Sequence, residues 1–134
     1  MRSLVLVRTF WNRWLGDRGE RAAALHLRRK GMRVIVRGYR TRLGEIDLIA
    51  RDGDTLVFVE VKSRRRGVPA EAVTPEKQRR ITLAALYFLR KHGLLEVRSR
   101  FDIVAVLWPD ERGEPQIEHI PNAFEAVGKG QMFR

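Results

Sequence analysis

The sequence predicts an α/β fold in which helices pack on a mixed β-sheet. Three observations support this: the expected elements follow the order helix, three strands, helix and strand; an Asp-Gly turn signal joins two β-rich runs; and 134 residues are enough for one buried core. We expect one domain at residues 16–120, between an N-terminal arm at 1–15 and a C-terminal tail at 121–134.

The arm at 1–15 combines arginines with apolar and aromatic residues. It is too apolar for a free tail and too short to fold alone, so we expect it to dock on the domain or on a second subunit. Attachment to a membrane surface is the alternative, since basic amphipathic segments also bind there. The apolar run at 4–7 is far shorter than the roughly 18 residues of a membrane span, and a cytoplasmic protein is expected.

A helix is expected at residues 17–30, because alanine and leucine fill its middle and Gly31 follows as a C-terminal stop. Glu20 falls in register with the buried alanines and Leu27, so it lies at the top of the stripe that faces the sheet. There it could point at a metal site. It could equally cap its own helix, because residues 17–20 fit the acid-x-x-Glu pattern of a capping box.

Residues 32–39 are rich in β-branched side chains and would form the first strand of the sheet. A hairpin is expected next, at 44–62, because Asp52-Gly53 is a strong turn signal between two β-rich runs. Both strands of this hairpin carry acidic residues.

The geometry of the turn decides where the acids of the hairpin lie. Side chains alternate along a strand, so Glu60 shares a face with Phe58 and Lys62. With a two-residue turn at the Asp-Gly pair, Glu45 lies opposite Glu60. Asp47 then lies opposite Phe58 and becomes a diagonal neighbour of Glu60. A four-residue loop places Asp47 directly opposite Glu60, whereas a three-residue loop without a bulge separates the two.

Carboxylates that converge on one face repel one another unless a positive charge neutralises them. Mg²⁺ or Mn²⁺ suits this position, because these hard cations prefer oxygen ligands and commonly take one or two protein carboxylates. We therefore expect Asp47 and Glu60 to be catalytic metal ligands. Lys62, on the same face, would orient a metal-bound water or neutralise charge on a phosphate, a combination typical of phosphodiester hydrolysis.

Asp47, followed after a turn by Glu60-Val61-Lys62, resembles the signature of the PD-(D/E)XK nuclease superfamily. More narrowly, the segments 44–49 and 58–62 resemble the YraN-type family, which is itself similar to archaeal Holliday-junction resolvases.

This resemblance spans residues 16–108, and it departs from the superfamily pattern where Ile46, not proline, precedes Asp47. It implies a restriction endonuclease-like fold: a three-layer α/β/α core with a mixed central sheet. The activity that it implies is that of a Mg²⁺- or Mn²⁺-dependent endonuclease acting on DNA, including branched or junction DNA.

The resemblance also implies roles for individual residues. Resolvase-like proteins carry a helical glutamate followed by arginine, which Glu20-Arg21 matches, so Glu20 is expected as a further catalytic ligand. By analogy with the superfamily, the backbone carbonyl of Val61 completes the metal site. Related nucleases place a lysine or glutamine of the second helix near the active site, which makes Lys77 and Gln78 candidates. A homodimer is implied as well, because a symmetric junction suits a two-fold enzyme.

A second helix is expected from Thr74-Pro75, a favourable N-cap and first turn, to His92-Gly93, a favourable stop. A further strand is expected at 100–108, and Asp102 at its entry suits a salt bridge with a nearby arginine better than a metal. Residues 116–120 suit an edge strand, and the tail from 121 onward suits a loop.

The chain carries 27 Lys and Arg residues against 16 Asp and Glu residues, a formal net charge of +11. Such an excess favours nucleic acid, with DNA first, over a ribosome-like or membrane surface. An arginine-rich proteome is the alternative explanation, and exposed arginines beside carboxylates are often only solvated pairs. The residues expected to contact a phosphate backbone are Arg21, Arg42, Arg64, Arg65, Arg66, Lys77, Gln78, Arg79 and Arg80.

Other chemistries are excluded by composition. The chain has no cysteine, which rules out disulfides, a thiol nucleophile and a thiolate zinc site. Its three histidines do not have the spacing of metal ligands. Beside the nuclease hypothesis stand a nucleic-acid-binding protein that retains the fold without catalysis, and a scaffold in which Glu60 and Lys62 form only a buried ion pair.

Overall fold

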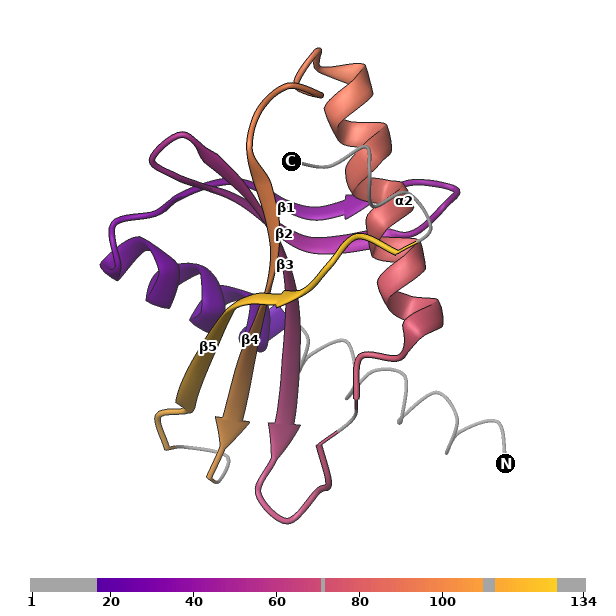
Figure 1. Ribbon diagram of the computed structural model, residues 1–134. Helices are drawn as coiled ribbons and strands as arrows, with labels where there is room; N and C mark the ends of the chain where they lie inside the picture. Colours follow the sequence, from indigo (N-terminus) through magenta and orange to yellow (C-terminus); the bar gives the residue numbers. More distant parts are fainter. Residues whose placement is uncertain (1–16, 71, 110–112, 128–134) are drawn as a thin grey trace.

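The computed structural model describes residues 17–70, 72–109 and 113–127 (Figure 1). The arm expected at 1–15 therefore lies outside the described residues. The elements are a helix at 17–29, β1 (Arg33–Arg40), β2 (Glu45–Asp52), β3 (Thr55–Arg65), α2 (Pro75–Lys91), β4 (Ser99–Trp108) and β5 (Gln116–Phe124). Their order is the one that the sequence predicts.

The five strands form one mixed sheet in the order β1-β2-β3-β4-β5. Neighbouring strands are antiparallel except β3 and β4, which are parallel because α2 carries the chain back across the sheet between them. β3 is thus the central strand, with partners on both sides.

The two described helices cover opposite faces of this sheet (Figure 1). On one face, Leu27 of the 17–29 helix shares a buried cluster with Leu48 and Val59. On the other face, the rings of Phe88 in α2 and Phe58 in β3 pack edge to face, with 6.1 Å between their centroids. The prediction of a three-layer α/β/α core with a mixed central sheet is confirmed, and the fold is consistent with a restriction endonuclease-like core.

α2 begins and ends where the sequence predicts. The Oγ1 atom of the N-cap residue Thr74 accepts a hydrogen bond from the backbone N–H of Lys77 at 3.2 Å, and Pro75 occupies the first turn. At the other end Gly93 has a φ of +65°, a conformation that glycine adopts without strain. The start of α2 fixes the position of Lys77 over the sheet.

The turn between β2 and β3 differs from the expected one. Asp52 pairs with Thr55, so the two turn residues are Gly53 and Asp54 rather than the predicted Asp52 and Gly53. Gly53 has a φ of +59°, as the first central residue of a type II′ turn requires. The predicted pairing of Glu45 with Glu60 is therefore wrong.

The actual register matches the alternative derived from a four-residue loop. The last ladder pair of the hairpin is Leu48 with Val59, and the next residues along the two strands are Asp47 and Glu60. The hairpin thus brings these two acids directly opposite each other.

β5 extends further than expected. It continues past Pro121 to Phe124, so the prediction of a loop from residue 121 onward is wrong for residues 121–124. A register shift against β4 and the positive φ of Asn122, +52°, accompany this extension, and the Phe124 ring stacks on Phe101 with 5.0 Å between centroids. In the part of the chain that is described, no helix has both the length and the apolar character needed to cross a membrane.

Candidate active site

The carboxyl groups of Asp47 and Glu60 lie together, one residue beyond the last pair of the β2–β3 ladder. Glu60 is 5% exposed, and Asp47 opposite it is half-buried. The Oδ2 atom of Asp47 accepts a hydrogen bond from the backbone N–H of Val61 at 2.7 Å. This N–H group lies beyond the last residue pair of the β2–β3 ladder. The hydrogen bond to it fixes the Asp47 carboxyl group beside that of Glu60.

Burial raises the pKa of Asp47 to about 8, and the negative charge of Glu60 adds to this shift. The Val61 hydrogen bond acts in the opposite direction, and a hydrogen bond with the Glu60 carboxyl group raises the pKa further. At neutral pH Asp47 therefore keeps its proton beside Glu60.

Lys77 supplies a positive charge to this pair. Its Nζ atom lies 2.6 Å from Oε1 of Glu60, and the Lys77 side chain is 44% exposed. Burial lowers the pKa of Lys77, but the hydrogen bond and the charge of Glu60 outweigh it and the pKa is raised. The sequence placed Lys77 among the phosphate contacts; the structure brings it into direct contact with a predicted ligand. The resemblance to related nucleases, which place a lysine or glutamine of the second helix near the active site, also indicated this position for Lys77.

Lys62 lies two residues beyond Glu60 on β3 and is half-buried. Strand alternation directs it to the same face as Glu60, as the sequence predicts, and it interacts with Lys77 closely enough to affect the pKa of that residue. Two amines from different elements, Lys62 and Lys77, thus adjoin the acid pair.

Glu20 approaches the same region from the 17–29 helix. It is half-buried; burial and the charge of Asp17 raise its pKa, whereas Arg37 and Arg40 lower it. The charge of Glu20 also raises the pKa of Asp47, so the two residues interact electrostatically. Among the described residues, however, no group of three or more His, Cys, Asp or Glu side chains is close enough to hold a metal ion as it stands.

The donor set fits a hard divalent cation. The Asp47 and Glu60 carboxylates and the Val61 carbonyl offer only oxygen atoms, which Mg²⁺ and Mn²⁺ prefer, and two protein carboxylates are a common complement for these ions. The ammonium group of Lys77, which contacts Glu60, supplies a positive charge that this pair of carboxyl groups requires.

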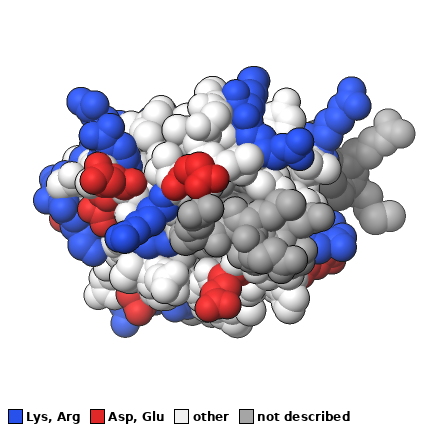
Figure 2. All heavy atoms as spheres, turned by 45° about the horizontal axis from the view of Figure 1, so that its top comes forward, with Lys and Arg blue, Asp and Glu red and all other residues white. Residues whose placement is uncertain are grey.

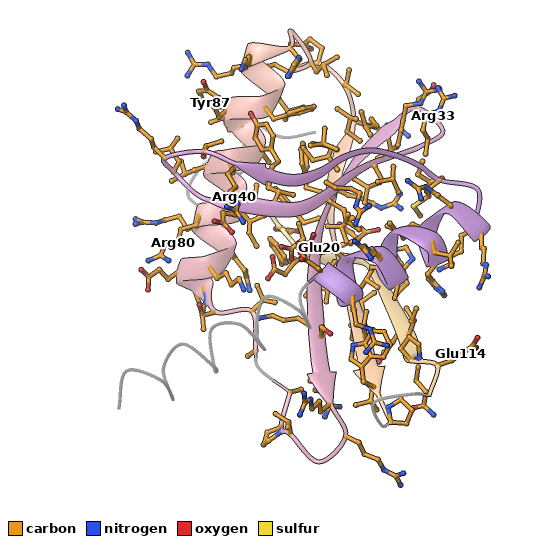
Figure 3. The ribbon with its side chains drawn as sticks, turned by 180° about the vertical axis from the view of Figure 1, so that it is seen from behind. Glu20, Arg33, Arg40, Arg80, Tyr87 and Glu114 are labelled. Atoms are coloured by element: carbon orange, nitrogen blue, oxygen red, sulfur yellow. The ribbon has the colours of Figure 1, made fainter. Side chains whose placement is uncertain are left out.

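The loop between β1 and β2 presses against α2 beside the site. A Cβ atom at Gly44 would overlap the backbone carbonyl oxygen of Arg80, so only glycine permits this approach. Thr41 holds the loop, since its Oγ1 atom accepts hydrogen bonds from the N–H groups of Leu43 and Gly44 at 3.0 and 3.1 Å. Figure 3 shows Glu20, Arg40 and Arg80 on this side of the molecule.

The predicted phosphate contacts lie on three segments next to this region. Arg42 is exposed in the β1–β2 loop, Arg21 is exposed on the 17–29 helix, and Arg79 and Arg80 are exposed in the first turns of α2. Arg80 forms an ion pair with Glu76 at 2.7 Å. On the face drawn in Figure 2, acidic side chains lie between the basic ones, so the positive charge there is interrupted.

Of the other predicted contacts, Arg64 and Gln78 hydrogen-bond to nearby backbone carbonyl groups. Arg64 donates to the backbone carbonyl of Val68 at 2.7 Å, and Arg65 and Arg66 are exposed after it. The Nε2 atom of Gln78 donates to the carbonyl of Val73 at 2.8 Å, which ties the start of α2 to the preceding loop.

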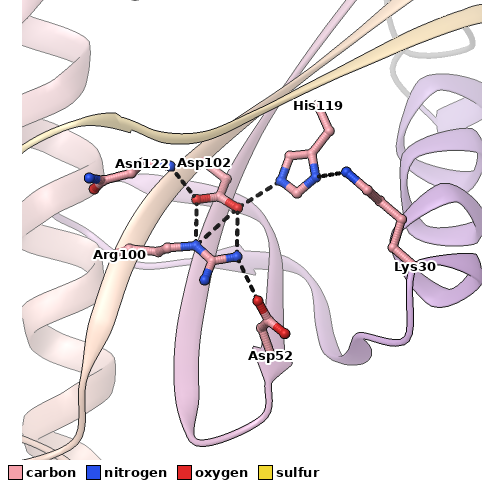
Figure 4. Close-up of polar contacts among 6 residues, drawn as sticks. All are labelled: Lys30, Asp52, Arg100, Asp102, His119 and Asn122. Carbon is pink, nitrogen blue, oxygen red and sulfur yellow. Dashed lines mark hydrogen bonds and ion pairs between the residues drawn. The ribbon is translucent and has the colours of Figure 1, made fainter.

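Asp102 belongs to a separate polar cluster (Figure 4). The Nε atom of Arg100 lies 3.0 Å from Oδ1 of Asp102, so the predicted salt bridge is confirmed. The Nε2 atom of His119 and the backbone N–H of Asn122 also bond this buried carboxylate, at 2.7 and 2.9 Å. Lys30, which follows the 17–29 helix, lies 2.8 Å from Nδ1 of His119. The cluster therefore joins β4, β5 and the far end of that helix, away from Glu20.

Comparison with known proteins identifies the family. Residues 19–106 match the family described as "Uncharacterised protein family UPF0102". A UPF0102 protein of Geobacter sulfurreducens is 56% identical over 119 residues, which cover 85% of this chain and 91% of that protein. A UPF0102 protein of Rhodococcus jostii is 52% identical over 113 residues, covering 82% of this chain and 95% of the relative. One from Rhodopirellula baltica is 50% identical over 128 residues, covering 91% and 77%. Together with the YraN-like motifs in β2 and β3, these matches establish that the chain belongs to the UPF0102 family.

Proposed function

We propose that this protein is a Mg²⁺- or Mn²⁺-dependent endonuclease that hydrolyses phosphodiester bonds in DNA, with branched or junction DNA as its preferred substrate. The observation that carries the proposal is the carboxyl pair of Asp47 and Glu60, which lie opposite each other, with the pKa of Asp47 raised to about 8 and the Lys77 ammonium group 2.6 Å from Glu60. The resemblance to the PD-(D/E)XK superfamily supports the same reading.

In this proposal Asp47, Glu60 and the Val61 carbonyl hold the metal ion, with Glu20 as a further ligand. A bound divalent cation lowers the pKa of water and neutralises charge on the phosphate. The ammonium groups of Lys62 and Lys77 then stabilise the negative charge that develops on the phosphate oxygens, because both adjoin the acid pair. The exposed arginines of the surrounding loops hold the rest of the backbone.

Cleavage assays with linear, branched and single-stranded DNA, and with RNA, test the proposal in Mg²⁺ and in Mn²⁺. Asp47→Asn and Glu60→Gln are each expected to lower the cleavage rate at least about 100-fold, because each removes a charged ligand. Glu45→Gln is the matched control. It lies two residues from Asp47 on β2 but is exposed and pairs with Arg40 at 3.7 Å, so its rate should stay near that of the wild type. Full activity in Asp47→Asn or Glu60→Gln would overturn the site.

A second candidate is a nucleic-acid-binding protein that keeps the fold without catalysis. The Lys77–Glu60 ion pair favours it, because an ammonium group already neutralises the buried carboxylate. Salt-sensitive binding of DNA with no turnover in either metal, and with equal affinity in Glu60→Gln and the wild type, is the outcome that this candidate predicts.

A further inference from the structure

Gly19 brings the 17–29 helix into direct contact with β3. A Cβ atom added at Gly19 would lie 2.7 Å from Cβ and 2.8 Å from Oγ of Ser63, and 3.6 Å from Cγ1 of Val61. The two contacts with Ser63 are shorter than van der Waals contact, so a side chain at position 19 would clash with Ser63. Helix propensity alone would favour alanine at this position, so the glycine is explained by the close approach and not by the helix.

A hydrogen bond holds Ser63 in place, so it cannot easily shift to make room for a larger residue at position 19. Its Oγ atom accepts a hydrogen bond from Nε1 of Trp108 at 2.8 Å, and Trp108 is 6% exposed. The guanidinium carbon of Arg18 lies 4.2 Å from the centroid of the Trp108 ring, a cation–π contact. Two consecutive helical residues, Arg18 and Gly19, are therefore held against the same end of β3 and β4.

Glu20 is the next residue along this helix. Its carboxyl group is half-buried and interacts with Asp47 through charge. Figure 3 shows Glu20 near the start of the helix, beside β3. Because neighbouring residues of a helix move together, the depth at which Gly19 sits on Ser63 sets the distance between Glu20 and the acid pair.

We infer that the contact between Gly19 and Ser63 positions Glu20 beside Asp47, which makes Gly19 and Ser63 positioning residues for the proposed metal centre. The inference rests on the proposed function, in which Glu20 is a ligand. Metal sites need their ligands within about 0.5 Å of the productive geometry, and a helix lifted by an added methyl group moves Glu20 by more than this.

Mn²⁺ binding to the full-length protein, followed by electron paramagnetic resonance of the free ion, tests the inference without relying on cleavage. Gly19→Ala is expected to weaken Mn²⁺ affinity about 10-fold, as loss of a supporting contact at a metal site does. Adding Ser63→Gly removes the opposing Cβ atom. The double variant should then bind within about 3-fold of Ser63→Gly alone, a recovery that general loss of structure would not produce.

Ser63→Thr provides a second route if Gly19→Ala fails to fold. It adds a methyl group from the β3 side and keeps the hydroxyl that Trp108 contacts, so it should weaken Mn²⁺ binding in the same direction. Leu25→Ala, at an exposed position of the same helix, is the control. A wild type that binds no Mn²⁺ overturns the proposed function. A wild type that binds Mn²⁺, with Ser63→Thr and Gly19→Ala equal to it or with no recovery in the double variant, overturns the positioning role alone.

Discussion

The pKa of Asp47 is strongly raised by its surroundings. Burial, together with the Glu60 charge, raises its pKa from an ordinary value of 3.8 to about 8. An acid whose pKa is raised by folding binds its proton more tightly in the folded chain than in the unfolded chain. Its contribution to stability is therefore complete below the unfolded pKa and is lost as the pH rises through the folded pKa.

The free energy of unfolding of the wild type is thus expected to fall as the pH rises from about 4 to about 8. Asp47→Asn should remove most of this fall, because the amide cannot ionise while its oxygen can still accept from Val61. The variant should be more stable than the wild type at pH 8, measured by urea unfolding at a series of pH values. Glu45→Gln should keep the wild-type slope. An unchanged slope in Asp47→Asn would mean that another group is responsible.

At the scale of elements, α2 connects helix capping to the site. Thr74 caps the first turn, and the same turn carries Lys77 to Glu60. Thr74→Ala should lower the free energy of unfolding by about 1 kcal/mol, because the side chain no longer accepts from the Lys77 N–H. Thr74→Ser keeps the acceptor and should lose less. Chemical denaturation distinguishes them, and equal losses in the two variants would show that the cap is not responsible.

The sequence predicts those parts of the elements that depend on local chemistry. Thr74 and Gly93 mark the ends of α2 because capping involves only neighbouring residues. The β2–β3 turn lies one residue later than predicted. An Asp-Gly pair suits more than one turn, and only the pairing of the whole ladder selects the register. Even so, Asp47 and Glu60 stayed on one face, since a two-residue change in register keeps the parity of a strand.

Contacts between elements that are far apart in the chain could not be predicted from the sequence. The ion pair between Lys77 and Glu60 depends on how α2 crosses β3, and the contact between Gly19 and Ser63 depends on how deeply a helix packs on the sheet. Neither distance has a local signal. Asp102 shows the opposite case, because an acid two residues from an arginine on one face of a strand already indicates its partner.

At the scale of the whole molecule, the chain has a net charge of +11, and among the described residues exposed arginines lie on several segments, such as Arg42 in the β1–β2 loop and Arg79 in α2. If Arg42 and Arg79 each neutralise a phosphate, replacing both with alanine should weaken duplex DNA binding and reduce the slope of log affinity against log salt by about 0.9 per contact. Fluorescence anisotropy over a salt series measures this slope. Arg28→Ala, at the far end of the 17–29 helix, should leave it unchanged. An equal loss in Arg28→Ala would indicate non-specific attraction by net charge.

The central claim is that Asp47 and Glu60 form a divalent cation site. Isothermal titration calorimetry of Mn²⁺ at pH 7, in buffers of different ionisation enthalpy, tests it directly. Because the pKa of Asp47 is about 8, binding should release about one proton per ion, and both Asp47→Asn and Glu60→Gln should abolish the tight binding. Mn²⁺ binding without proton release, or with the same affinity in both variants, would contradict the account.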